Sequence, residues 1–152
     1  MEIFGQLGMA LAFGLGALGS ALGIGTAGRA AAGAWAKEAR EGKPLNFAYI
    51  ILTGMPLSQT IYGFILMLVG LAPAVANPVI AAKYPGVLLS IGMAGGIAEL
   101  FSAWMQGAIG AAACRALSEG EGKGLAFMII AMGIVETVGL FGFVFPLLVM
   151  PS

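Results

Sequence analysis

Long apolar segments alternate with short polar ones along the chain. The apolar segments predict four helices, over residues 4–36, 46–76, 84–115 and 124–149. Each segment is longer than the roughly 20 residues that an α-helix needs to cross a bilayer. Residues 44–82 contain no charge, and residues 125–152 contain one, Glu136. The pattern therefore predicts an all-α integral membrane protein with four transmembrane helices.

Composition supports the membrane assignment. Of the 152 residues, 60% are hydrophobic and 9% are charged, whereas soluble domains are about 25% charged. The formal net charge is zero, so the charge balance does not indicate that the protein binds nucleic acid. We find no nucleotide-binding loop and no nucleophile beside a base, so we predict no catalytic site and no bound nucleotide. The single cysteine, Cys114, allows no internal disulfide, and we expect it to pack as a small hydrophobe.

The basic residues beside the spans predict the orientation in a cell membrane. The first and third connections hold Lys37, Arg40, Lys43, Arg115 and Lys123, whereas the second holds Lys83 alone. Because Lys and Arg are enriched in cytoplasmic loops, loops 37–45 and 116–123 are expected in the cytoplasm, with both termini outside. Residues 1–10 lack the basic start of a signal peptide, so we expect this segment to remain as the first span.

An internal repeat relates the two halves of the chain. A shift of 77 positions places Gln59 on Glu136. The same shift pairs Met55 with Met132, Thr60 with Thr137, Gly19 with Gly96, and Gly33 with Gly110. We predict one membrane domain, 1–152, made of two fused helical hairpins, 1–76 and 77–152. The halves differ at Pro56 against Gly133 and at Tyr62 against Gly139, so we expect them to have separate tasks.

Small residues form two stripes on the first predicted helix. One stripe holds Gly5, Gly8, Ala12, Gly16, Gly19 and Gly23, and the other holds Gly14, Ala17, Ala21, Gly25 and Gly28. Small residues let helices approach closely in lipid, and two stripes suit a helix packed in a ring. An ordinary helix pair inside one monomer is the alternative. The second and fourth helices carry bulky residues that we expect to face lipid: Phe64, Leu66, Met67, Leu68, Phe141, Phe143, Phe145 and Leu147.

Glu136 is predicted to meet several neutral oxygens at one membrane depth. Gln59, Gln106 and Glu136 lie at similar distances from the cytoplasmic turns, and Ser58 and Tyr62 flank Gln59. Pro56 removes one helical hydrogen bond and frees a carbonyl about one turn earlier. One carboxylate with neutral oxygens suits a monovalent cation, because a divalent metal normally takes more carboxylates. The alternative is that these side chains only hold helices together by hydrogen bonds.

Three motifs resemble the membrane rotor proteolipid, subunit K or c, of V-type and A-type rotary ATPases. They are Met55-Pro56-Leu57-Ser58-Gln59-Thr60-Ile61-Tyr62-Gly63-Phe64, Leu100-Phe101-Ser102-Ala103-Trp104-Met105-Gln106-Gly107, and Val135-Glu136-Thr137. The Gly-rich segment from Leu22 to Gly28 adds to the likeness. The resemblance covers nearly the whole chain.

This resemblance implies a homo-oligomeric ring that turns in the lipid bilayer against a stator membrane subunit and carries central-stalk subunits. It implies one ion per protomer on Glu136, with Na+ favoured over H+ alone. The implied Na+ ligands are Met55, Ser58, Gln59, Gln106 and Glu136, with Tyr62 holding the carboxylate. The hydroxyl ligand is often Thr in the family, and Ser58 keeps an oxygen there.

Four residues fit this scheme less directly. Glu99 lies seven residues before Gln106; we interpret it as a protonated carboxyl that is hydrogen-bonded to backbone or lines the pore of the ring, or else as a secondary ion or proton site. Arg29 is expected to extend toward the membrane interface. Trp35 is expected to anchor at that interface, and Trp104 to pack in the protein.

Two other classes of protein remain open from the sequence. A small four-helix proton-coupled exporter also uses a membrane carboxylate, although its pocket is normally lined by aromatic residues. A structural proteolipid would show no ion dependence and would tolerate Glu136→Gln. The mass of the detergent-solubilised oligomer separates an exporter from a rotor ring.

Overall fold

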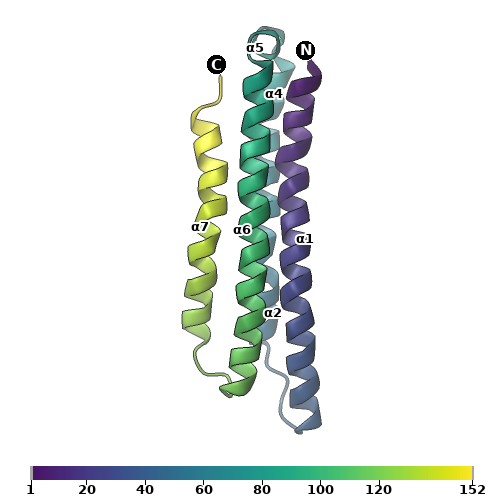
Figure 1. The fold of residues 1–152 in the computed structure, drawn as a ribbon, viewed down its shortest axis with the longest axis vertical. Coiled ribbons are helices and arrows are strands. Elements are labelled where there is room, and N and C mark those ends of the chain that lie inside the picture. Colours follow the sequence, from purple (N-terminus) through teal and green to yellow (C-terminus); the bar gives the residue numbers. More distant parts are fainter. Residues whose placement is uncertain (1, 152) are drawn as a thin grey trace.

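Four long helical rods run side by side through the protein. A computed structural model describes residues 2–151 (Figure 1). The first, third and fourth rods are α1 (Glu2–Arg40), α6 (Pro85–Glu119) and α7 (Leu125–Leu148). The second is a continuous rod over 48–76, made of α2 (Ala48–Gly54), η1 (Met55–Leu57), α3 (Ser58–Ile65), η2 (Leu66–Leu71) and α4 (Ala72–Ala76). All four rods are long and apolar enough to cross a membrane, which confirms the predicted all-α membrane fold.

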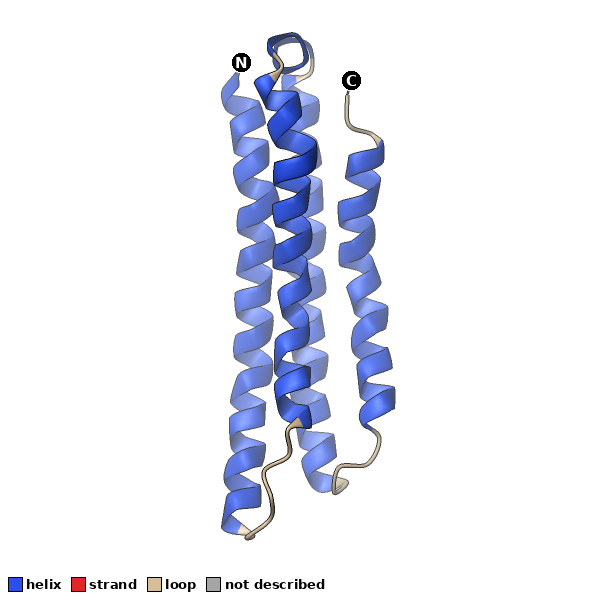
Figure 2. Cartoon of the chain, turned by 180° about the vertical axis from the view of Figure 1, so that it is seen from behind, coloured by secondary structure: helices blue, strands red, loops and turns tan. Residues whose placement is uncertain are grey.

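The two hairpin connections lie at one end of the bundle, and both termini lie at the other (Figures 1 and 2). A short helix that was not predicted, α5 (Pro78–Lys83), joins the second and third rods at the terminal end. Its N-cap is Asn77, whose side-chain oxygen accepts hydrogen bonds from the backbone N–H groups of Val79 at 3.0 Å and Ile80 at 3.3 Å. Pro78 follows at the first helical position, where a missing N–H costs nothing.

Two helices end about one turn later than predicted. The predicted ends at residues 36 and 115 were wrong, since α1 continues to Arg40 and α6 to Glu119. Charge marks where the apolar segment stops, but Lys, Arg and Glu are good helix formers. Lys37 and Arg40 lie in the last turn of α1, where a cation complements the helix dipole. The helices therefore extend beyond their apolar segments.

Proline shapes the second rod at two places. The buried ring of Pro56 lies in a 3₁₀ turn, Met55–Leu57, because proline donates no N–H to an α-helical bond. A π-helical segment, Leu66–Leu71, precedes Pro73. Such local departures from α geometry re-satisfy backbone groups that proline leaves free. The 3₁₀ turn lies directly before Ser58 and Gln59 and so determines where these two side chains point.

Glycines bring the backbones of α1 and α6 into direct contact. A Cβ on Gly107 would overlap the backbone of Gly23, and a Cβ on Gly92 would overlap that of Gly8. The first small-residue stripe of α1 therefore packs inside the chain. The second stripe is only partly covered, and a Cβ on Gly14 would meet no atom within 4 Å. Packing of α1 against α6 within one chain explains the first stripe. It does not explain the second stripe.

Two apolar clusters lie along the bundle, one toward each end. The cluster near the hairpin connections contains Tyr49, Leu52, Leu117 and Cys114. Cys114 has no exposed surface, as expected for a small hydrophobe. The cluster toward α5 consists of Ala12, Leu66, Leu71, Ala74, Leu88 and Ile91.

Half of the eight bulky residues predicted to face lipid are exposed on the single chain, and three more are half-buried. Phe64, Leu68, Phe141 and Phe145 are exposed. Leu66 is fully buried, so its lipid-facing assignment was wrong. The reason is that successive helical residues point about 100° apart, and a run of three bulky residues cannot share one face.

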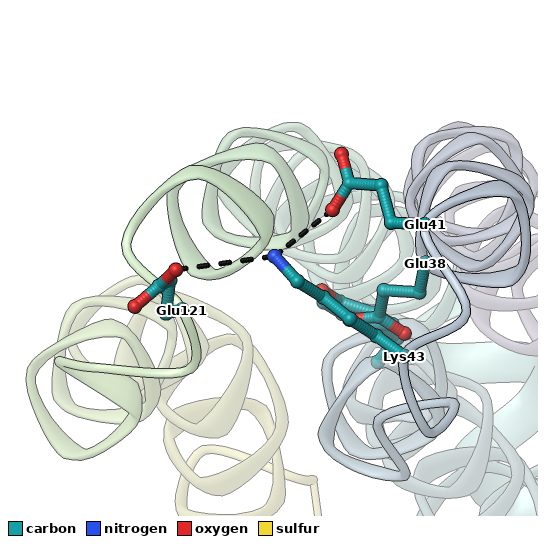
Figure 3. Close-up of polar contacts among 5 residues, drawn as sticks. Glu38, Glu41, Lys43 and Glu121 are labelled. Carbon is teal, nitrogen blue, oxygen red and sulfur yellow. Dashed lines mark hydrogen bonds and ion pairs between the residues drawn. The ribbon is translucent and has the colours of Figure 1, made fainter.

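Charged side chains tie the two hairpin connections together. Lys43 Nζ lies 2.9 Å from Glu41 Oε2 and 3.9 Å from Glu121 Oε1, which belongs to the other connection (Figure 3). The hydrogen bond from Lys43 lowers the pKa of Glu41, and the same bond raises the pKa of Lys43. Trp35 Nε1 donates to the Asn46 carbonyl oxygen at 2.9 Å, so the predicted interface tryptophan also holds the first connection.

Candidate ion-binding site

The Glu136 carboxylate receives hydrogen bonds from two different helices. Tyr62 Oη, on α3, donates to Glu136 Oε1 at 3.0 Å. Gln106 Nε2, on α6, donates to Glu136 Oε2 at 3.2 Å. Each carboxylate oxygen therefore has one neutral donor, and the two bonds together fix the orientation of the carboxylate.

A network of amide and hydroxyl groups continues behind the carboxylate. Gln59 Nε2 donates to Gln106 Oε1 at 3.3 Å and to Ser102 Oγ at 3.0 Å. Gln106 Nε2 also reaches the Met132 carbonyl oxygen at 3.2 Å, and Ser102 Oγ donates to the Val135 carbonyl oxygen at 2.9 Å. These bonds fix both glutamine side chains, since neither can turn without leaving a buried polar group unpaired.

Three uncharged oxygens gather at the 3₁₀ turn of the second rod. Ser58 Oγ lies 3.1 Å from the Met55 carbonyl oxygen and 3.1 Å from Gln59 Oε1. The hydroxyl carries one proton, so it can donate to only one of them at a time. With Glu136 on the facing helix, these atoms form a set of hard oxygen donors.

The inner side of the site is buried. Gln59 and Gln106 have no exposed surface, while Glu136 is half-buried. The Tyr62 ring stacks on Phe143, with ring centroids 5.7 Å apart and an interplanar angle of 10°. Because this stack fixes the Tyr62 ring, its hydroxyl is held toward Glu136.

The donor set fits a monovalent cation. Within the part of the chain that the structure describes, the ion pairs are those of Lys43 at the hairpin connections, so no basic side chain neutralises Glu136. Among residues 2–151, no group of three or more His, Cys, Asp or Glu could hold a metal. One carboxylate surrounded by neutral oxygens balances a single positive charge.

All six residues predicted for the site lie in one connected set. They are Met55, Ser58, Gln59, Tyr62, Gln106 and Glu136. Their role in binding an ion stays a prediction. The sequence analysis assigned no role to Ser102, although it lies four residues before Gln106 and so on the same helical face. That spacing was the sequence feature from which its place beside Gln106 could have been predicted.

The remaining polar and aromatic residues make no hydrogen bond to this network within the described chain. Glu99 has no exposed surface, and neither carboxylate oxygen has a hydrogen-bond partner in the described chain. The backbone hydrogen bond predicted for it is therefore absent from the described chain, whereas its protonation and its role stay predictions. Arg29 is exposed and lines a cavity with Lys37 and Arg115. Trp104 is 40% exposed on the single chain and stacks on Phe101.

Sequence comparison identifies the family. A family profile that describes the C subunit of ATP synthase matches residues 7–70 and again residues 89–149. The chain belongs to this ATP synthase C-subunit family. It is also 30% identical, over 152 residues, to the A-type ATP synthase subunit K of Methanocaldococcus jannaschii. That alignment covers 97% of this chain and 62% of the relative.

The two matches to the family profile fall in the two halves of the chain. The first match contains Gln59, and the second contains Gln106 and Glu136. The candidate site of this C-subunit homologue is therefore built from both repeats, with one carboxylate between them.

We predict that Tyr62→Phe makes Glu136 more reactive in this C-subunit homologue. The substitution removes the donor at 3.0 Å, and a hydrogen bond to a charged group contributes about 1.5–3 kcal/mol. The ionised carboxylate loses that stabilisation, and a hydrophobic carbodiimide modifies only the protonated form. Labelling of Glu136 at fixed pH should become roughly tenfold faster, as measured by mass spectrometry.

Tyr84→Phe is the matched control, because Tyr84 lies between α5 and α6 and makes no contact with the site. Equal labelling rates for Tyr62→Phe and the wild-type chain would contradict a role for Tyr62 in holding the carboxylate.

Proposed function

We propose that this protein is the ion-carrying rotor subunit of an A-type or V-type rotary ATPase and binds one Na+ per chain at Glu136. The observation that carries the proposal is a single carboxylate, midway along the apolar helix α7, in a network of neutral oxygens. Membership of the ATP synthase C-subunit family and the likeness to an A-type ATP synthase subunit K support the same function.

A bound ion would allow Glu136 to cross lipid. A charged carboxylate at the centre of a membrane helix costs about 2.5–3.5 kcal/mol on insertion scales. One cation cancels that charge, and the bonds from Tyr62 and Gln106 hold the carboxylate in place meanwhile. The neutral site can then face the hydrocarbon.

Sodium is proposed over a proton because the liganding oxygens are all present. Met55 O, Ser58 Oγ and Gln59 Oε1 lie together, and Gln106 adds its side-chain oxygen next to Gln59. A proton would need little beyond the carboxylate itself. Together these oxygens would replace the hydration shell of a metal ion, which a proton does not need.

Assembly into a ring would bury the surfaces that the single chain leaves open. The second small-residue stripe of α1, with Gly14, is available to a neighbouring copy. The outer face of α7 is apolar, with Phe127 78% exposed and Ile134 65% exposed, as expected for contact with lipid. Glu136 would then lie near the rim, within reach of a stator.

At the stator, a cationic side chain of that partner would compete with the bound ion for Glu136. Release to one side and rebinding from the other would move one charge across the membrane, which costs or yields about 2.3 kcal/mol per 100 mV. The equivalent position in the first repeat is Gln59, so this pocket would carry one ion per two hairpins.

The proposed orientation places the hairpin connections in the cytoplasm and both termini outside. Five basic residues, Lys37, Arg40, Lys43, Arg115 and Lys123, lie at or near the connections, and Lys83 lies at the other end. This asymmetry supports the orientation through the positive-inside rule. The linked connections would form the surface that contacts the central stalk.

Carbodiimide labelling with and without sodium tests the proposal. The purified oligomer is treated with a hydrophobic carbodiimide, and modification of Glu136 is followed by mass spectrometry at several pH values. Sodium should slow the labelling, whereas potassium at equal ionic strength should not. Labelling that depends on pH alone would make the carried ion a proton, and failure to label Glu136 would rule out the ion-carrier function.

A further inference from the structure

Ser102 is a buried hydroxyl whose proton is already committed to one partner. The residue is 1% exposed. Its Oγ donates to the Val135 carbonyl oxygen at 2.9 Å and accepts from Gln59 Nε2 at 3.0 Å. A hydroxyl has one proton, so the bond to Val135 leaves only lone pairs to face Gln59. Ser102, on α6, is therefore a fixed acceptor for an amide of the second rod.

The two ends of the Gln59 amide have different surroundings. Nε2 donates to Ser102 Oγ and, over the longer distance of 3.3 Å, to Gln106 Oε1, so both N–H groups of the amide are used. Oε1 lies 3.1 Å from Ser58 Oγ, on the side where the candidate ligands gather. If the amide turned over, two amide oxygens would face each other and Nε2 would take the place of Oε1. An N–H group in that place would repel a cation.

Close packing of α7 holds Ser102 and Gln59 together. A Cβ on Gly139 would lie 3.0 Å from Ser102 Oγ and 3.1 Å from Gln59 Cγ, so a larger residue there would push these groups apart. The shift of 77 positions that relates the repeats places Gly25 on Ser102. The hydroxyl is therefore present in the second repeat alone, which is also the repeat that carries the site's carboxylate.

We propose that Ser102 is a positioning residue that sets the affinity of the site for Na+. Its hydroxyl holds the Gln59 amide with Oε1 toward the cation and does not itself touch the ion. A proton on Glu136 needs no oxygen from Gln59, so losing the hydroxyl should weaken sodium binding and leave protonation unchanged. This inference rests on the proposed function, since it requires that sodium binds at Glu136.

Ser102→Ala tests the proposal through carbodiimide labelling of Glu136 in the purified oligomer. The sodium concentration that halves the labelling rate should rise roughly tenfold, about the effect of one lost hydrogen bond. Without sodium, the pH at which labelling is half-maximal should match that of the wild-type chain, because the bonds from Tyr62 and Gln106 to Glu136 remain. A general loosening of the site would shift both quantities.

Ser90→Ala is the matched control, because Ser90 also lies on α6 and its exposed hydroxyl bonds only the Val87 carbonyl oxygen of the same helix. It should need the same sodium concentration as the wild-type chain. If sodium protects the wild-type chain and Ser102→Ala equally, the positioning role is overturned and the proposed function stands. If sodium does not protect the wild-type chain, sodium binding and this inference fail together.

A double variant separates positioning from packing. Gln59→Met keeps the length of the side chain and removes the amide. If Ser102 acts through Gln59, adding Ser102→Ala to Gln59→Met should raise the required sodium concentration no further, since coupled residues are not additive. A further tenfold rise in the double variant would show that Ser102 acts on packing alone and would overturn the proposal.

Discussion

The Glu136→Gln variant is expected to lose ion transport while keeping the four-helix fold. Gln has nearly the same shape and can still take part in hydrogen bonds with Tyr62 and Gln106, but it carries no charge to attract a cation. Two unit charges 4 Å apart interact by about 4 kcal/mol near a protein surface. Losing that interaction should weaken cation affinity roughly a thousandfold. Sodium uptake by proteoliposomes that contain the assembled ATPase measures the effect.

Thr137→Ala is the control for this variant. Thr137 is the next residue, and its hydroxyl bonds only the Ile134 carbonyl oxygen of its own helix. Its transport should stay near the wild-type rate, and both variants should unfold at similar temperatures. Transport by Glu136→Gln at the wild-type rate would exclude the rotor function and leave a structural proteolipid.

Gly107→Ala is expected to cause the largest loss of stability. Its Cβ would overlap the Cα, carbonyl carbon and oxygen of Gly23, which are backbone atoms that no rotamer change can move aside. Overpacking a well-packed core typically costs 1–3 kcal/mol and occasionally more, and we expect about 3 kcal/mol here. Unfolding of the purified chain in a denaturing detergent, followed by circular dichroism, measures the loss.

Gly33→Ala is the matched control, because it lies on α1 and its Cβ would meet no atom within 4 Å. It should be neutral or slightly stabilising, since Ala is the better helix former by about 1 kcal/mol. If Gly107→Ala and Gly33→Ala unfold alike, then α1 and α6 do not pack as closely as described.

The candidate site could be predicted almost completely, for a simple reason. Gln59, Gln106 and Glu136 are conspicuous because polar residues are rare within apolar spans, and the hairpin turns place them at one depth. Ser102 was missed because a serine is common in membrane helices and carries no such signal. Its role depends on Gln59 and Val135, which belong to two other rods.

Glu99 shows the opposite case. Its charge was as conspicuous as that of Glu136, yet its surroundings could not be deduced from its helix alone. Its lack of a hydrogen-bond partner depends on which residue of α7 packs against it, and that residue is Gly139. A glycine gives no indication of this role in the sequence, because what matters is the atom that is missing.

Hydropathy was sufficient to determine the number of spans and their membrane location, because lipid requires every backbone group to be bonded within a helix. Hydropathy did not predict the exact helix ends, the capped helix α5 or the π-helical segment before Pro73. These features depend on local hydrogen bonds near polar or proline residues. Tertiary structure alone decided which stripe of α1 meets α6 and which partners each carboxylate has. Periodicity defines the face on which a residue lies, whereas only packing decides what lies opposite that face.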